Sequence, residues 1–102
     1  MRVDQGVTNV PSAGTAVQLS NNNTSRVKWM RFKAVAGNSG LIYVGVSTPS
    51  RPLSATIGYE LSAGNTVDLN FGEFGGSVQA LAFYVDAATN NDKVSWIMIL
   101  EG

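Results

Sequence analysis

The feature that most constrains this chain is an alternation of apolar and polar residues that recurs along most of its length. Successive side chains of a β-strand point to opposite faces, so a period of two indicates strands with one buried face. No window carries the 3.6-residue apolar stripe of an amphipathic helix. The alternation therefore predicts an all-β fold with minimal helix content.

Seven short segments carry this pattern, and turns containing Gly, Asn and Pro separate them. They are residues 15–19, 27–35, 41–46, 58–61, 66–71, 80–87 and 94–100. Strands at spacings of about 8–12 residues are typical of a β-sandwich or barrel, of which a jelly roll is one solution. We predict a single two-layer antiparallel β-sandwich domain over residues 15–102, jelly-roll-like, preceded by an extended N-terminal arm over residues 1–14.

Composition argues against most catalytic chemistry. The 102 residues include no His and no Cys, which removes the usual general base, the thiolate nucleophile and the commonest metal ligands. Seven basic and seven acidic residues cancel, so nothing attracts phosphate at a distance. No apolar stretch approaches the roughly 20 residues that span a bilayer. We expect no enzyme, no catalytic residue, no cofactor, no metal, no direct nucleic-acid partner and no membrane partner.

The acidic residues stand in no catalytic motif. Asp68 and Asp86 fall on outward strand positions, where a solvated charge is the ordinary expectation. Residues 90–92, Asn-Asn-Asp, have side chains that a calcium-binding loop could use, but they lack the EF-hand spacing and its glutamate. A hairpin turn is the favoured interpretation of that segment.

The last segment is apolar on nearly both faces. One face would carry Val94, Trp96, Met98 and Leu100, and the other would carry Ser95, Ile97 and Ile99. In a two-layer sandwich only one of these faces meets the core, because the other face points outward. The second face, with Ile97 and Ile99, therefore predicts a contact with another protein.

Outward aromatic and basic residues extend this predicted interface. Trp29 stands on the outward face of its segment next to Arg31, and Tyr43 and Tyr84 fall on outward positions elsewhere. Trp, Tyr and Arg are enriched in protein interfaces. A carbohydrate platform built from Trp29 and the tyrosines is the alternative. The candidate interface residues are Trp29, Arg31, Tyr43, Tyr84, Ile97 and Ile99.

A longer pattern covers about residues 26–100. It runs through Met-Arg-Phe-Lys-Ala (30–34), Leu-Ile-Tyr-Val-Gly (41–45), Gly-Tyr-Glu-Leu-Ser-Ala-Gly-Asn-Thr-Val-Asp-Leu (58–69) and Ala-Phe-Tyr-Val-Asp-Ala-Ala-Thr-Asn-Asn-Asp (82–92). This pattern resembles the small β-sandwich structural proteins of tailed bacteriophages, which include capsid decoration (cement) proteins, head fibres and tail modules.

The resemblance implies a non-enzymatic virion protein on the capsid surface, made in the host cytoplasm. As a decoration protein it would bind across neighbouring major capsid subunits, stabilise the expanded head and associate with itself as a homotrimer. Repeated contacts from one trimer would act together through avidity. A tail or head-fibre component is the alternative within this class, and a carbohydrate-binding β-sandwich module is the alternative outside it.

Overall fold

Nine β-strands make up the regular structure of the chain. The computed structural model describes residues 2–20, 26–47, 53–54, 56–72, 78–79 and 82–100. The strands are β1 (Arg2–Asn9), β2 (Val17–Gln18), β3 (Arg26–Ala34), β4 (Ile42–Val46), β5 (Tyr59–Leu61), β6 (Thr66–Asn70), β7 (Val78–Gln79), β8 (Phe83–Ala87) and β9 (Lys93–Leu100). The described residues contain no α-helix, and the all-β prediction is confirmed.

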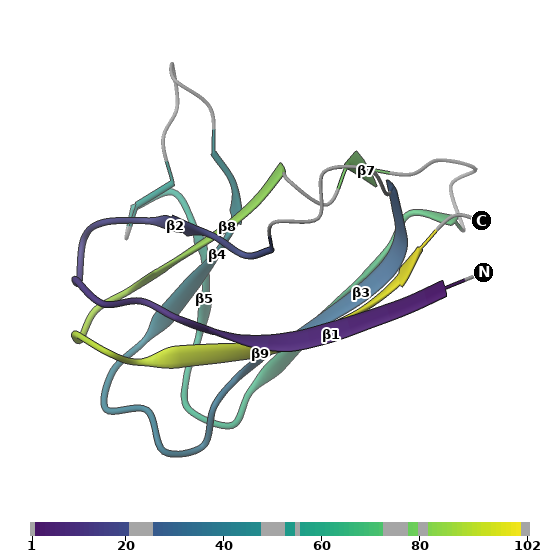
Figure 1. Cartoon of the computed structure of the whole chain (residues 1–102). Coiled ribbons are helices and arrows are strands. Elements are labelled where there is room, and N and C mark those ends of the chain that lie inside the picture. The colour runs from purple at the N-terminus through teal and green to yellow at the C-terminus, as the bar shows by residue number, and fades with distance from the viewer. Residues whose placement is uncertain are drawn as a thin grey trace.

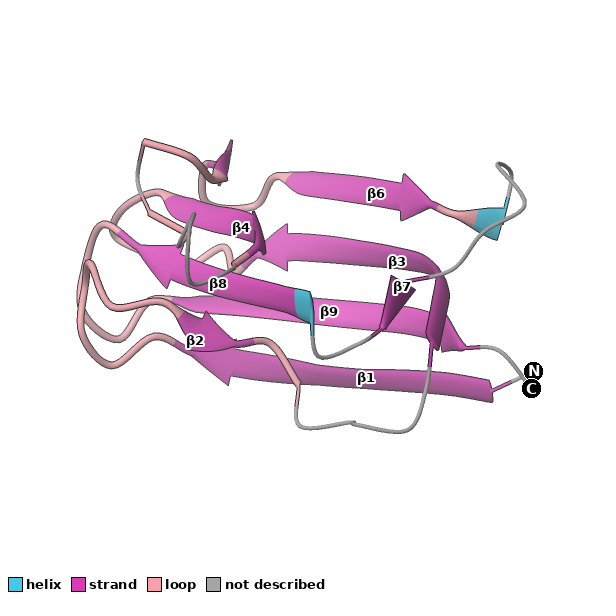
Figure 2. Cartoon of the chain, turned by 90° about the horizontal axis from the view of Figure 1, so that it is seen from above, coloured by secondary structure: helices cyan, strands magenta, loops and turns pink. Residues whose placement is uncertain are grey.

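The strands form two antiparallel sheets that pack face to face (Figure 1). Sheet A has the order β1-β9-β3-β6, with β7 paired to the start of β3. Sheet B has the order β2-β8-β4-β5. Viewed from above, the strands of sheet B lie over those of sheet A (Figure 2). The predicted two-layer sandwich is confirmed.

The strand order is that of a jelly roll. The hydrogen-bonded pairs β4/β5, β3/β6, β2/β8 and β1/β9 are nested within one another along the chain. The chain behaves as one long hairpin, with its turn between β4 and β5, rolled so that successive pairs fall alternately in sheet B and sheet A. Two Greek keys wound in this way define the jelly roll.

The core lies between the sheets and takes one face from each long strand. Met30, Phe32 and Ala34 of β3 are fully buried. Val94 and Met98 of β9 lie beside them in the same sheet and are also fully buried. From sheet B, Phe83 meets Phe32 edge-on with ring centroids 6.0 Å apart. The inward face of β3 and β9 is therefore the face that their alternation predicts.

The predicted N-terminal arm is extended, but most of it belongs to the sheet. All eight residues of β1 pair with β9, from Arg2 opposite Leu100 to Asn9 opposite Lys93. Beyond β1, Val10 is fully buried, and its backbone exchanges hydrogen bonds with Asn91 and Asp92. An edge strand buries little of its own surface, so β1 needs few apolar residues and its alternation is weak. Residues 2–9 are therefore an edge strand of sheet A.

Close packing against β9 explains one residue of β1. Gly6 lies opposite Trp96, and a Cβ atom at Gly6 would stand 2.8 Å from the indole carbon Cζ2. The missing side chain lets the indole ring lie against the backbone of the edge strand. Trp96 Nε1 donates a hydrogen bond to Thr8 Oγ1 at 3.0 Å, which ties the ring to the same strand.

Candidate protein-binding face

The outward face of sheet A is a flat grid of side chains from four strands. Residues that are paired in antiparallel strands point to the same side of a sheet. The pairing places three rows on this face: Val3, Ile99, Trp29 and Asn70; Gln5, Ile97, Arg31 and Asp68; and Val7, Ser95, Lys33 and Thr66. We call these twelve residues the sheet A face.

Four of the six predicted interface residues meet on this face. Ile99 is paired with Trp29, and Ile97 with Arg31, so that two apolar side chains of β9 lie beside an aromatic and a basic side chain of β3. Ile97 and Ile99 are outside the buried core cluster and are half-buried. The prediction that β9 presents a second apolar face, away from the core, agrees with this geometry.

Two valines of β1 extend the apolar part of the face. Val3 and Val7 are 61% and 62% exposed, the highest exposures among the aliphatic side chains of the described residues. They lie opposite Ile99 and Ser95, at the free edge of the sheet. The sequence interpretation missed them because it assigned residues 1–14 to an arm.

An ion pair organises the polar part of the face. Arg31 makes two parallel hydrogen bonds to Asp68, from Nε to Oδ1 at 2.6 Å and from a terminal nitrogen to Oδ2 at 2.7 Å. The guanidinium group also lies 5.5 Å from the ring centroid of Trp29. Arg31 is thus fixed between β6 and its own strand, and a fixed side chain loses less entropy when a partner binds.

The same contact shifts the acid–base equilibria of both groups. Hydrogen bonds from Arg31 lower the pKa of Asp68 below its ordinary value, with slight desolvation opposing the shift, and they raise the pKa of Arg31. Since the folded-state pKa of Asp68 is depressed, the stabilisation is present above the unfolded pKa and is lost as the pH falls through the folded pKa. Both side chains are about half exposed, so the contribution to folding is small.

We predict that the Asp68 carboxyl group titrates at lower pH in the native chain than in an Arg31→Gln variant. The guanidinium group is the cause of the shift, so its removal should bring the pKa of Asp68 back toward its ordinary value. Carbon-detected NMR titration of the Asp68 carboxyl group in both proteins measures this directly. An equal titration midpoint in both proteins would contradict the ion pair.

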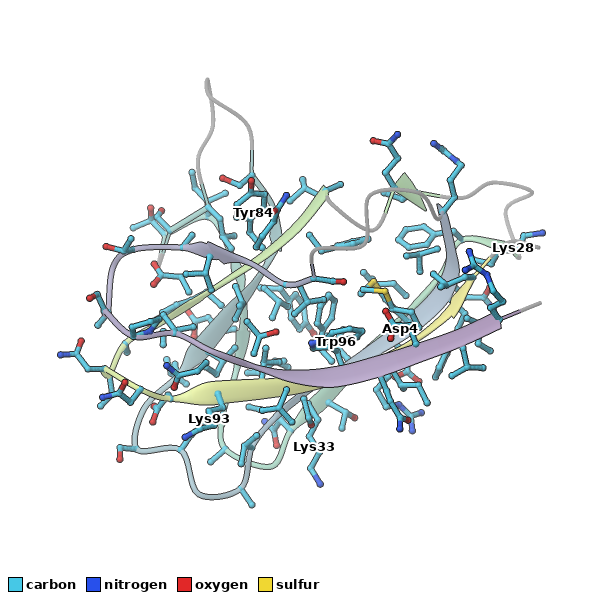
Figure 3. All side chains as sticks on the ribbon, in the orientation of Figure 1. Asp4, Lys28, Lys33, Tyr84, Lys93 and Trp96 are labelled. Carbon is cyan, nitrogen blue, oxygen red and sulfur yellow. The ribbon has the colours of Figure 1, made fainter. Side chains whose placement is uncertain are left out.

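Tyr43 and Tyr84, the other two predicted interface residues, lie on the opposite side of the molecule. They belong to β4 and β8 and point to the outward face of sheet B. Figure 3 shows Tyr84 on the far side of the molecule from Lys33, which belongs to the sheet A face, with Trp96 between the sheets. Tyr43 is only 7% exposed. Trp29 and these tyrosines therefore form no common platform.

Loops cover part of the outward face of sheet B. Leu53 is buried, and it lies against Gly45 and Gly58, where added Cβ atoms would approach its side chain to 3.3 and 3.0 Å. The same Cβ atom at Gly58 would stand 2.7 Å from Cβ of Tyr43. Leu53 and Gly58 therefore pack against β4 and cover Tyr43. The sheet A face has no such cover from the described residues.

Asp92 stabilises two turns of the chain through its carboxylate oxygens. Asp92 accepts hydrogen bonds from the backbone N–H groups of Ser39 and Gly40, one on each oxygen, and so joins the turn after β3 to the turn before β9. Asn91 adopts the left-handed conformation there, with φ of 67°, as a tight turn requires. Residues 90–92 act as a turn, in agreement with the favoured interpretation.

The described residues contain no cluster of three or more His, Cys, Asp or Glu side chains arranged to hold a metal ion. Within the same ranges, no helix is long and apolar enough to cross a membrane. Residues 80 and 81 of the predicted segment 80–87 lie outside the described residues.

Comparisons of the chain with protein-family models, with curated proteins and with solved structures produced no match.

Proposed function

We propose that this chain is a non-enzymatic structural protein of a virus particle, and specifically a capsid decoration protein that binds neighbouring capsid subunits. The observation that carries the proposal is the sheet A face, where Ile97, Ile99 and Trp29 lie beside Val3 and Val7 without cover from the described residues. Apolar side chains gathered on one exposed face mark a protein contact.

The dimensions of the face fit such a contact. Strands lie about 4.8 Å apart and rise about 3.3 Å per residue, so these four strands, of five to nine residues, span roughly 300–600 Å² in projection. Side-chain relief increases the accessible area of the same face. A stable interface buries about 800 Å² on each partner. The sheet A face therefore supplies the centre of an interface, and its rims or a second contact must supply the rest.

The chemistry of the face also fits a protein partner. The face combines apolar and polar side chains. Its two central strands carry Ile97, Ile99, Trp29 and Arg31, and the edge strand β6 carries Asn70, Asp68 and Thr66. Aromatic side chains and Arg are enriched in protein interfaces. The jelly-roll fold occurs in viral capsid proteins and also in lectins, so the fold by itself does not decide between them.

We further propose a homotrimer as the form that binds the capsid. Three identical contacts act together and multiply the strength of a weak single contact. Light scattering of the purified protein tests this step, with a mass near three times 10.8 kDa expected. A mass of 10.8 kDa at all concentrations would reject the trimer and leave a monomeric clamp.

Co-sedimentation with capsid shells tests the function itself. The shells are assembled from the major capsid protein of the virus whose genome carries this gene, and both unexpanded and expanded forms are used. We expect saturable binding to expanded shells and a higher temperature of shell disruption when the chain is bound, because ligand binding to the intact form stabilises it. Absence of binding to either form would reject the proposal.

A further inference from the structure

Asp86 is a buried carboxylate on the outward face of sheet B. The sequence pattern predicts a solvated charge at this position, and that prediction is wrong, because Asp86 is only 1% exposed. Its side chain shares the outward face with Tyr43, to which it is paired across β8 and β4. Gly14 lies in the connection between β1 and β2, and its backbone N–H donates to Asp86 Oδ1 at 3.0 Å.

The hydrogen bonds satisfy one oxygen of this carboxylate. The backbone N–H of Ala87 donates to Oδ1 at 2.7 Å, the same oxygen that Gly14 uses. Within the described part of the chain, no group donates a hydrogen bond to Oδ2, and the ion pair of Arg31 with Asp68 lies on the other sheet. A buried carboxylate without a counter-charge is costly, unless a ligand supplies one.

A hollow of about 450 Å³ opens beside this carboxylate. Asp86, Tyr43 and Gly14 line it, together with the hydroxyl-bearing Ser54 and Thr56 and three alanines. Ser54 and Thr56 bond to each other through their hydroxyl groups at 3.0 Å. Among the described residues that line the hollow, Asp86 is the only charged one.

A basic side chain matches each of these features. An ammonium or guanidinium group supplies a positive charge and N–H donors for Oδ2, to which the described residues donate no hydrogen bond. Its methylene stem suits the alanine methyl groups, and a cation is attracted to the face of an aromatic ring such as that of Tyr43. A neutral sugar would donate hydroxyl groups to the carboxylate but would leave its charge uncompensated, so the cation is favoured.

We propose that the Asp86 hollow binds a lysine or arginine side chain of a partner protein. The identity of that partner as a capsid subunit rests on the proposed function, whereas cation binding by the hollow does not. The hollow lies on sheet B and the apolar face on sheet A, on opposite sides of the sandwich. The chain then has two separate contact surfaces, as a protein that bridges subunits requires.

NMR titration of the isolated, ¹⁵N-labelled protein at low salt tests the hollow. The probes are n-butylammonium and ethylguanidinium, and the reporters are the amide signals of Gly14 and Ala87, which donate to Asp86. We expect saturable chemical-shift changes with both probes, and a binding affinity that is at least tenfold lower in Asp86→Asn. This variant retains an acceptor oxygen for Gly14 and Ala87, and its dispersed spectrum and melting temperature check that it folds.

Glu60→Gln is the matched control. Glu60 is paired with Tyr43 on the same outward face, is exposed, and is absent from the lining of the hollow. It removes the same charge from the same sheet, so cation binding should change less than twofold. Equal weakening in both variants would reduce the effect to net charge and overturn the proposal.

Two other results would also overturn it. One is saturable binding of methyl glucoside with no response to either cation, which would make the hollow a saccharide site. The other is cation binding that appears only in an Arg51→Gln variant, which would assign the hollow to an arginine of the chain itself. Shell co-sedimentation separates this proposal from the proposed function: cation binding without shell binding rejects only the function, and shell binding without cation binding rejects only the hollow.

Discussion

Replacing Ile97 by lysine is expected to leave the chain folded and to weaken its association with protein partners by at least about 30-fold. Ile97 lies in the middle row of the sheet A face and outside the core cluster, so the substitution opens no cavity. A charged group forced into the centre of an apolar contact costs about 2 kcal/mol or more, and each 1.4 kcal/mol is tenfold in affinity. Shell co-sedimentation and light scattering measure the loss.

The cost to folding should stay within about 1 kcal/mol, since the new lysine lies opposite Arg31 and like charges across a sheet repel weakly. Val46→Lys is the matched control, because it also replaces an aliphatic side chain by lysine. Val46 is 52% exposed and lies at the end of β4 in sheet B. Its replacement should leave association unchanged. An unfolded Ile97→Lys protein would place Ile97 in the core and contradict the assignment of the two faces of β9.

Replacing Phe32 by alanine is expected to remove about 3–5 kcal/mol from the free energy of unfolding. Phe32 is fully buried between the sheets and meets Phe83 of sheet B edge-on. Its loss leaves a cavity where the two sheets meet, and it removes a large part of the 5–15 kcal/mol that a domain of this size has in total. Urea denaturation followed by tryptophan fluorescence measures the change.

Lys33→Ala is the control for Phe32→Ala. Lys33 is the next residue of β3, is exposed, and points to the sheet A face. Its replacement should change the unfolding free energy by no more than about 0.5 kcal/mol. A loss below about 1 kcal/mol for Phe32→Ala would mean that the sheets do not pack around this ring.

The central strands could be predicted from the sequence because burial on one face leaves a complete period-two pattern. In β3, the buried Met30, Phe32 and Ala34 alternate with the more exposed Trp29, Arg31 and Lys33. In β9, the apolar residues on both faces correctly indicated a second face beyond the core. Local alternation carries this information, because each side chain reports the face on which it lies.

Two structural features could not be read from that pattern. The edge strand β1 buries little and places Gly6 and Thr8 toward the core, so its apolar periodicity is weak. Asp86 sits at an outward position but is only 1% exposed, and Gly14 of the connection between β1 and β2 donates a hydrogen bond to it. Both depend on contacts between residues more than 70 positions apart, as in the bond from Gly14 to Asp86.

The alternation pattern identified outward-facing residues of the candidate site, but it did not identify which of them lie on the same sheet. Trp29, Arg31, Ile97 and Ile99 fall together because β3 and β9 are neighbours in sheet A. Tyr43 and Tyr84 also point outward, but from sheet B. Alternation tells which residues face outward, whereas only the order of strands tells which outward residues share a face.

Hydroxyl-radical footprinting of the chain on expanded capsid shells tests directly whether the sheet A face is the surface that contacts a partner. Trp29 belongs to the sheet A face, and Tyr59, which is 62% exposed at the β5 edge of sheet B, is the internal reference. We expect shell binding or trimer formation to reduce the oxidation of Trp29 several-fold relative to the monomer, and to leave the oxidation of Tyr59 unchanged. Unchanged oxidation of Trp29 in a chain that is bound to shells would contradict it.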